Sequence, residues 1–323
     1  MNTHLEFAEA ETKKWLGDRC RDLRFSQIMK GGSSRRFYRV EGIEEGALPQ
    51  GLIVIVTDDA EESARYARIA EFLLKQGVHV PMVYRWNAGS GTMWMGDFGE
   101  EDLLAKKGMP DQEAWYLQTM REVSKIHQIP YEKNEYNLDL LPPFDPDMYR
   151  WEQEYFFLNA LRVHYGLNGK MVDALEADAE LRELTYELAE LPRCFVHRDF
   201  QSQNVMLIEE GVGFIDFQGL RAGLAGYDFA SLVHDPYVQL PWDKRMELLK
   251  TYIRKEELEW NWSLFHKLAL QRLMQCLGAY GFLGYEKGKV HFREFFTPAM
   301  ISLKQTLEEI KGMKQLRHVL ELL

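Results

Sequence analysis

Residues 196–218 of this 323-residue chain, VHRDFQSQNVMLIEEGVGFIDFQ, constrain its fold more than any other stretch. Two short apolar runs, Val-Met-Leu-Ile and Gly-Phe-Ile, flank a Glu-Glu-Gly segment that is typical of a tight turn. Paired as an antiparallel hairpin centred near Glu210, partner residues have numbers that sum to about 420, which places Asn204 opposite Asp216. Amide and carboxylate oxygens are ligands that Mg²⁺ prefers, so Asn204 and Asp216 are candidate metal ligands.

The spacing of polar residues in this segment has a precedent in phosphoryl-transfer enzymes. His-Arg-Asp, four residues, Asn and then a strand that ends in Asp is the catalytic-loop arrangement of protein-kinase-like phosphotransferases. In that chemistry Asp199 accepts the proton of the attacking hydroxyl, while Asn204 and Asp216 hold the ions that bridge the ATP phosphates. A surface hairpin with polar ends explains any one of these residues, but the three together favour a shared site between two lobes.

Three segments carry a resemblance to a known family. VHRDFQSQNVM, FIDFQGLRAGLAGYDFASL and HDPYVQLP resemble the aminoglycoside phosphotransferase and choline kinase family, from about residue 26 to about residue 240. Within it they look most like the cell-wall sugar kinases that phosphorylate the anomeric hydroxyl of N-acetylmuramate and N-acetylglucosamine. The Asp-Phe-Gln at 216–218 fits this small-molecule branch, which lacks the protein-kinase activation segment. The resemblance implies an ATP- and Mg²⁺-dependent kinase of a small molecule.

Apolar periodicity along the rest of the chain predicts an α+β fold of two lobes, the protein-kinase-like architecture. We expect a β-rich small lobe at 1–95, a hinge at 96–99 and a larger, mostly helical lobe at 100–323. Strands are predicted at 26–30, 35–40, 52–57, 82–86 and 92–95, and helices at 5–16, 61–76, 113–127, 146–165, 174–191, 246–255, 262–280 and 292–322.

A glycine- and serine-rich loop precedes the second predicted strand. Gly31, Gly32, Ser33 and Ser34 could cradle phosphate oxygens with consecutive backbone N–H groups, because glycine lets the chain approach a ligand closely. An ordinary hairpin turn is the alternative. The position of the loop, one strand before LIVIV, favours the phosphate interpretation.

The third strand lacks the lysine that kinase-like folds use to bind the α- and β-phosphates, and residues 31–74 contain none. Arg35, Arg36 and Arg39 are the candidate replacements, because guanidinium binds phosphate in a bidentate manner. Side chains alternate along a strand, so Arg36 faces away from the other two, and we expect Arg36 to contact the phosphates. The sugar kinases that the chain resembles also tend to have an Arg-Arg pair here. With no lysine to pair with, Glu62 is predicted to be a solvated helix residue.

Met95, Asp97 and Phe98 fall in the predicted hinge, where an adenine ring needs backbone N–H and C=O groups between apolar walls. These residues are therefore candidate nucleotide contacts, although Asp97 could instead cap the segment that follows.

Acceptor residues are less specific in the sequence. Glu152 and Glu154 lie in an aromatic-rich predicted helix that either packs on the large lobe or offers carboxylates to a pyranose. Asp235 and Tyr237 follow the metal loop and are further candidates, whereas Asp228 is predicted to be the N-cap of the next helix.

Bulk properties limit the partners. A net charge of −11 argues against nucleic acid or an anionic membrane as the main partner. It is compatible with a cationic substrate, although an acidic surface also serves solubility alone. The three cysteines are far apart, no apolar run is long enough to span a membrane and the N-terminus is polar, so we expect a cytoplasmic enzyme. Three alternatives remain: an aminoglycoside, choline or homoserine-type kinase, a pseudokinase that acts as a nucleotide-binding scaffold, and a metal-dependent phosphohydrolase.

Overall fold

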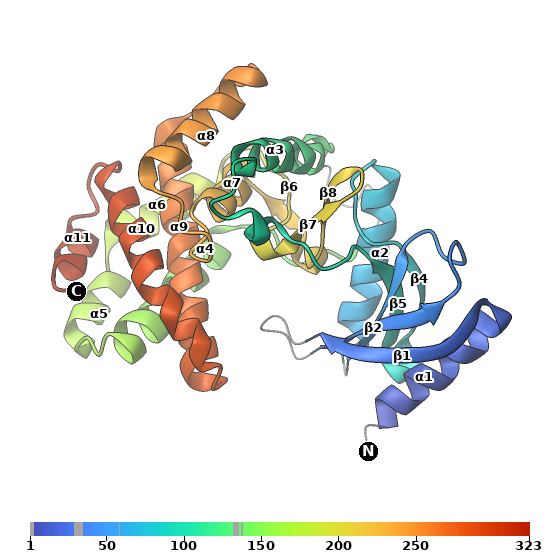
Figure 1. Ribbon diagram of the computed structural model, residues 1–323. Helices are drawn as coiled ribbons and strands as arrows, with labels where there is room; N and C mark the ends of the chain where they lie inside the picture. Colours follow the sequence, from blue (N-terminus) through green and yellow to red (C-terminus); the bar gives the residue numbers. More distant parts are fainter. Residues whose placement is uncertain (1–2, 29–34, 58, 132–135, 137) are drawn as a thin grey trace. The chain divides into compact units, whose positions relative to one another are not determined.

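The computed structural model describes residues 3–28, 35–57, 59–131, 136 and 138–323 (Figure 1). The chain divides into two compact units, which are described separately. Unit 1 comprises Met1–Asp102, Asn134–Leu140 and Asn204–Gln218; unit 2 comprises Leu103–Lys133, Leu141–Gln203 and Gly219–Leu323. The Gly31–Ser34 loop of the sequence prediction lies outside the described residues, and the lobe boundary at 96–99 stays a prediction.

Unit 1 is built on an antiparallel sheet of five strands in the order β1-β2-β3-β5-β4. All five strands were predicted, because each alternates apolar and polar residues or is a short β-branched run. Their bounds are β1 Cys20–Ile28, β2 Arg36–Ile43, β3 Gly51–Val56, β4 Val83–Asn87 and β5 Thr92–Asp97.

The central strand β3 is apolar on both faces. Leu52, Val54 and Val56 cluster with Ala8 of helix α1 (Thr3–Leu16) and with Trp94 of β5. The alternate β3 side chains are also buried and point to the opposite face. Helix α2 (Ala60–Lys75) follows β3, and its N-cap is Asp59, whose carboxylate accepts a hydrogen bond from the Glu62 amide.

A separate hairpin, β7 (Val205–Ile208) and β8 (Gly211–Phe214), also belongs to unit 1. Backbone hydrogen bonds attach it to the rest of the unit, since Leu207 N donates to Glu101 O and Phe214 N to His79 O, both at 2.8 Å. The predicted hairpin is confirmed, but Val205 pairs with Phe214. Its register therefore differs by one residue from the predicted one.

Unit 2 is mainly helical. Its helices are α3 Gln112–Gln128, α4 Pro146–Phe156, α5 Gly169–Glu176, α6 Ala179–Ala189, α7 Ala225–Val233, α8 Trp242–Lys255, α9 Trp262–Gly281, α10 Phe296–Glu308 and α11 Lys314–Glu321. A short antiparallel pair, β6 (Cys194–Val196) with β9 (Arg221–Gly223), carries the segment that leads into His197–Asp199.

Helix α9 is buried along most of its length and forms the centre of the unit 2 core. Its Gly278 lies against the backbone of Tyr155 and Phe156, where a Cβ would come within 2.8 Å of a Tyr155 carbon. This close approach lets α9 pack directly on α4. Among the described residues, no helix is both long enough and apolar enough to cross a membrane.

Candidate active site

The His197–Asp199 segment of unit 2, the predicted catalytic loop, follows β6 and is fixed by one buried carboxylate. Asp228 accepts hydrogen bonds from the backbone amides of His197 (2.8 Å) and Arg198 (2.9 Å), and it lies 3.0 Å from Nε2 of His127. The predicted N-cap role of Asp228 is wrong, because α7 begins at Ala225 and Asp228 lies within its first turn. Its carboxylate instead sets the backbone of the residues that precede Asp199.

The backbone conformation at Arg198 is unusual for a residue with a side chain. Its φ is +76°, in the left-handed region that non-glycine residues rarely adopt. Such conformations cluster at functional sites, where surrounding hydrogen bonds impose them. At Arg198 the bond from its amide to Asp228 is one of these restraints.

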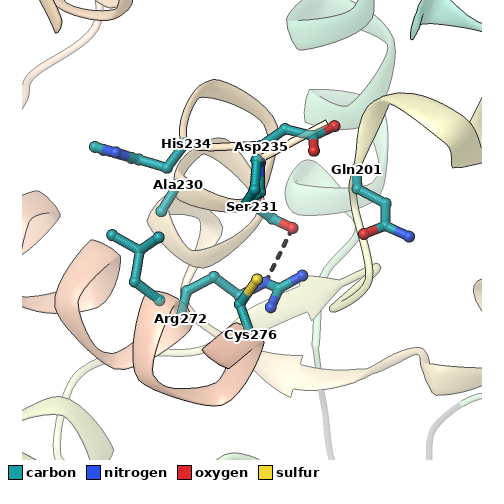
Figure 2. A pocket seen from close by; sticks show the side chains of 9 residues that line it. Gln201, Ala230, Ser231, His234, Asp235, Arg272 and Cys276 are labelled. Carbon is teal, nitrogen blue, oxygen red and sulfur yellow. Dashed lines mark hydrogen bonds between the residues drawn. The ribbon is translucent and has the colours of Figure 1, made fainter. Parts of the chain in front are cut away.

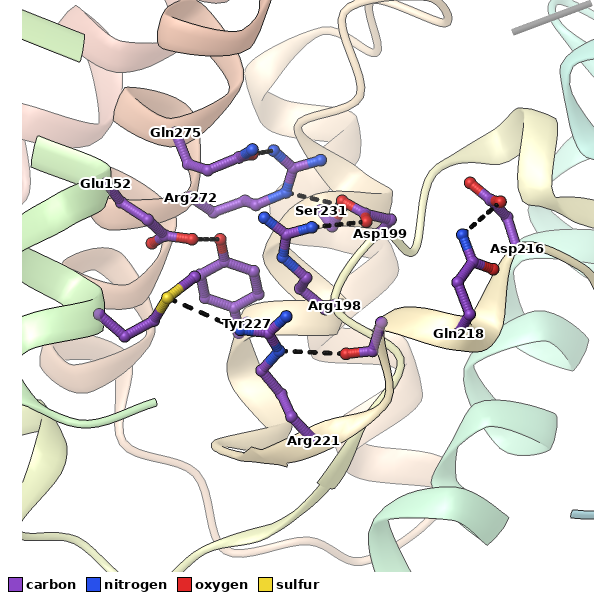
Figure 3. A network of polar contacts seen from close by, with 12 residues as sticks. Glu152, Arg198, Asp199, Asp216, Gln218, Arg221, Tyr227, Ser231, Arg272 and Gln275 are labelled. Atoms are coloured by element: carbon purple, nitrogen blue, oxygen red, sulfur yellow. Dashed lines mark hydrogen bonds and ion pairs between the residues drawn. The ribbon is translucent and has the colours of Figure 1, made fainter. Parts of the chain in front are cut away.

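Asp199 lies among cationic side chains (Figure 3). The Arg198 guanidinium donates from Nη1 to Oδ2 of Asp199 at 3.0 Å. Burial disfavours the charged carboxylate, but the positive charges of Arg198, Arg272, His197 and Arg221 outweigh it, so the pKa of Asp199 is lowered. Asp199 is therefore an ionised carboxylate that can accept a proton.

Asn204 and Asp216 belong to the hairpin of unit 1. The Ile215 amide donates to the Asn204 carbonyl at 3.0 Å, so Asn204 lies opposite Ile215 and Asp216 is the next residue. Asp216 has a φ of +63°, and its side chain is 37% exposed, so a ligand can reach its carboxylate. Gln218 donates from Nε2 to Oδ1 of Asp216 at 2.9 Å.

This donor set fits magnesium. One amide and one carboxylate are hard oxygen ligands of the kind that Mg²⁺ takes when nucleotide phosphates and water supply the others. Over the part of the chain that the structure describes, no group of three or more His, Cys, Asp and Glu could hold a metal ion by itself.

Arg35 lies immediately before β2 and pairs with two carboxylates of unit 1, those of Asp216 and Glu62. Its Nη2 lies 2.6 Å from Oδ1 of Asp216, and its Nη1 lies 3.8 Å from Oε1 of Glu62 in α2. The prediction that Glu62 is only a solvated residue is wrong, because its carboxylate faces this buried guanidinium. Burial opposes the charge on Arg35, but Asp216 and Glu62 raise its pKa.

The predicted hinge residues have identifiable contacts within unit 1. Met95 is buried in β5, and the Asp97 carboxylate accepts from Nε of Arg39 at 2.6 Å. Phe98 packs on β8 at Gly213, where an added Cβ would lie 2.5 Å from the ring. Nucleotide contacts by these three hinge residues stay predictions.

Of the two candidate glutamates of α4, Glu152 is fully buried. It accepts hydrogen bonds from the Tyr227 hydroxyl (2.7 Å) and from Nε2 of Gln271 (3.2 Å), as Figure 3 shows for Tyr227. Glu154 is exposed and pairs with Arg150 at 3.0 Å. Internal contacts thus account for both carboxylates, and their roles toward a substrate stay predictions.

Asp235 lines a small cavity of unit 2, together with the Gln201, Ser231 and Arg272 side chains (Figure 2). Its Oδ2 accepts from the Ser202 amide and its Oδ1 from the Tyr237 amide, at 2.8 and 2.9 Å, so Asp235 fixes the loop on both sides. With a volume of about 10 Å³, the cavity has room for about one water molecule. It could take one end group of a ligand but not a sugar ring.

Sequence reasoning did not find Arg272, which lies in a helix with no motif around it. It is 7% exposed, and its guanidinium donates to the Ser231 hydroxyl at 3.0 Å and to Gln275. Among the described residues it forms no ion pair within 4 Å, although the charge of Asp199 acts on it. A buried cation without a directly bonded carboxylate is a feature that only the folded structure shows.

Comparisons with known proteins place the chain in a family. The model of a phosphotransferase enzyme family matches residues 25–266. A Pseudomonas aeruginosa protein named N-acetylmuramate/N-acetylglucosamine kinase is 28% identical over 228 residues, which are 69% of this chain and 63%, less than two thirds, of that relative.

Two solved structures share the protein-kinase-like fold. A choline/ethanolamine kinase family protein from Mesorhizobium loti has a TM-score of 0.62 at 15% identity, over 98% of each chain. An aminoglycoside phosphotransferase from Streptomyces rimosus, in complex with ADP and streptomycin, has a TM-score of 0.58 at 14% identity, over 84% of this chain and 98% of that one. The predicted fold and family are confirmed: this chain belongs to the phosphotransferase enzyme family.

Proposed function

We propose that this phosphotransferase transfers the γ-phosphate of ATP, with Mg²⁺, to a hydroxyl of an amino sugar. The acceptor class is N-acetylmuramate or N-acetylglucosamine, at the anomeric hydroxyl. The observation that carries the proposal is the Asp199 carboxylate, which cations keep ionised on a loop whose backbone Asp228 fixes. The name of the Pseudomonas aeruginosa relative supports the acceptor class.

Asp199 acts as the base in this proposal. The acceptor hydroxyl gives its proton to the carboxylate while its oxygen forms a bond to the γ-phosphorus, and the bond from that phosphorus to the ADP oxygen breaks. Arg198 holds one oxygen of Asp199 and so fixes the orientation of the carboxylate toward the acceptor. Only four residues separate Asp199 from Asn204 in the sequence, as in the catalytic loops of protein-kinase-like phosphotransferases.

Asn204 and Asp216 are the proposed magnesium ligands. When bound, Mg²⁺ would neutralise charge on the phosphate oxygens as the leaving group departs. Arg36, the Gly31–Ser34 loop and the hinge residues Met95, Asp97 and Phe98 remain proposed contacts for the nucleotide. Transfer then depends mostly on positioning and on compensation of charge.

Asp235 and Tyr237 are the proposed acceptor contacts of unit 2. Asp235 lines the cavity that the Arg272 guanidinium also lines, so an end group of the acceptor there would meet both a carboxylate and a cation. Glu152 and Glu154 remain weaker candidates, because their carboxylates already have protein partners.

The test is ADP release from Mg-ATP across N-acetylmuramate, N-acetylglucosamine, an aminoglycoside and choline. We expect turnover with an amino sugar, and Asp199→Asn should lower that rate by a factor on the order of 10²–10⁴. Asp173→Asn is the matched control, because Asp173 is an exposed aspartate of the same unit, paired only with Arg162 among the described residues.

Other outcomes would select another function. A near-normal rate for Asp199→Asn would contradict the role of Asp199 as the base. Turnover only with choline or the aminoglycoside would show that the acceptor is not an amino sugar of the proposed class. Phosphate release without any acceptor would favour a phosphohydrolase. Nucleotide binding without turnover on any acceptor would favour a scaffold.

A further inference from the structure

The Arg35 guanidinium lies next to Asp216, where the proposed nucleotide site needs a cation. Its side chain is 7% exposed, lies between Glu62 and Asp216, and has its guanidinium carbon 5.4 Å from the Phe37 ring centroid. All four residues belong to unit 1. A buried guanidinium held by two carboxylates and an aromatic ring has a defined orientation.

The third strand cannot supply this charge. All β3 residues from Leu52 to Val56 are buried and apolar, on both faces of the sheet. Kinase-like folds pair a cation at the triphosphate with a glutamate on the helix that follows that strand. Here the helix glutamate is Glu62, and the cation that faces it is Arg35 rather than a β3 lysine.

Arg36 does not share this arrangement. It opens β2 opposite Val56, and neighbouring residues of a strand point to opposite faces. Among the described residues Arg36 forms no ion pair, whereas Arg35 forms two. The sequence favoured Arg36, whereas the ion pairs identify Arg35 as the arginine that faces Glu62 and Asp216.

Arg35 also binds one carboxylate oxygen of Asp216, the proposed metal ligand. Oδ1 of Asp216 accepts from both Nη2 of Arg35 and Nε2 of Gln218. A dication at this oxygen would lie next to a guanidinium and be repelled by it. A triphosphate offers the guanidinium a different anionic partner, since phosphate binds arginine in the same forked geometry as carboxylate.

We propose that Arg35 replaces the missing lysine and exchanges partners when nucleotide binds. Without nucleotide it neutralises Asp216 and keeps the bare metal away; with nucleotide it binds the phosphates and leaves Asp216 to the metal. This inference rests on the proposed ATP and Mg²⁺ site, and it makes the metal affinity of the protein depend on the nucleotide.

The experiment measures two binding constants for the full-length chain without any acceptor. Mn²⁺ alone, followed by electron paramagnetic resonance, reports the metal site, and a fluorescent ADP analogue without metal reports the phosphate site. Arg35→Met should bind Mn²⁺ about tenfold more tightly and the ADP analogue about tenfold more weakly, which is within the usual range of coupling between sites. Arg35→Lys keeps the charge and should retain weak Mn²⁺ binding.

Arg68→Met is the matched control, since Arg68 of α2 makes only an exposed ion pair with Asp139 among the described residues. If Arg35 exchanges partners, Arg35→Met changes the affinities for Mn²⁺ and for the ADP analogue in opposite directions. If Arg35 has a purely structural role, the same variant weakens both affinities. The proposal is overturned if Arg35→Met weakens the binding of both Mn²⁺ and the ADP analogue, or if it changes neither affinity. It is also overturned if Arg36→Met weakens ADP binding while Arg35→Met does not. Neither binding measurement uses an acceptor, so its outcome does not depend on which sugar is phosphorylated. Absence of turnover with every sugar of the panel would contradict only the proposed function.

Discussion

Opposing influences act on the Asp199 carboxylate: burial favours its protonated form, and the surrounding cations favour the ionised form. The cations outweigh burial, so its pKa is lowered. A base with a lowered pKa stays ionised as the pH falls below the ordinary carboxylate range, and activity that depends on it is lost only when the pH passes through the folded-state value. The cost is a weaker base, which positioning has to offset.

Arg272→Gln tests this account of Asp199. Removing one of the lowering charges should move the acidic limb of the profile of kcat/KM against pH toward higher pH. Arg293→Gln is the control, because Arg293 is an arginine of the same unit bonded to the Gly284 carbonyl and not among the cations that act on Asp199. An acidic limb at the same pH in Arg272→Gln and the wild type would contradict the assigned cause.

The burial of Glu152 should make the free energy of unfolding depend on pH. Burial raises its pKa against the opposing charge of Arg198, so the folded state binds this proton more readily than the unfolded state. The stability that it contributes is present below its unfolded pKa and is lost as the pH rises through the folded value. Glu152→Gln is never charged and keeps an acceptor for Tyr227, so its free energy of unfolding should gain on the wild type as the pH rises above the ordinary carboxylate pKa.

Urea denaturation at each pH measures this gain. Glu152→Ala, which leaves a void and an unpaired Tyr227 hydroxyl, should instead lose roughly 2–4 kcal/mol. The exposed neighbour Glu154 provides the control, and Glu154→Gln should stay within about 0.5 kcal/mol of the wild type. A pH-independent difference between Glu152→Gln and the wild type would show that the carboxyl does not titrate as described.

At the scale of elements, the β7–β8 hairpin depends on a close approach between a ring and a backbone. Gly213→Ala would place a methyl group 2.5 Å from a Phe98 ring carbon, so the ring or the strand would have to move. We expect this variant to lose roughly 1–3 kcal/mol of unfolding free energy in urea. Gly89→Ala is the control, since its nearest neighbour would lie at 3.4 Å; equal stability of the two variants would argue against the packing.

Local sequence patterns predicted most of the secondary structure. Strands and most helices were predicted because apolar alternation is local, and β5 begins at the expected Thr92. The predicted helix at 174–191 is two helices, because Asp178 caps a new start at Ala179. Strands β6 and β9 have three residues each, too few for a periodic signal.

The candidate site divides in the same way. Asp199, Asn204 and Asp216 lie within eighteen positions of one another, so their motif could be found in the sequence. Arg35 is separated from Asp216 by 181 positions, and only folding brings the two together. The role of Asp228 was missed because its partners, the amides of His197 and Arg198, are about thirty residues away.

At the scale of the whole molecule, ligand binding should appear as added stability. Mg²⁺ with nucleotide should raise the unfolding free energy of the wild type by about 2.7 kcal/mol at a ligand concentration near 100 times Kd. Asp216→Asn should lose the Mg²⁺-dependent part of that gain, whereas Asp173→Asn should keep it. Thermal unfolding with nucleotide, with and without Mg²⁺, makes the comparison, and an undiminished gain in Asp216→Asn would remove its proposed metal role.

Asp228 has one further consequence. Its carboxylate ties α7 to the catalytic loop, so the chemistry is positioned from a helix that follows the metal motif in the chain and precedes α8 to α11. Changes at the exposed positions of α8, α10 and α11 leave this tie in place, whereas α9 carries Arg272, whose charge also acts on Asp199. The position of the Asp199 carboxylate thus depends on α7, and its ionisation depends on α9 as well.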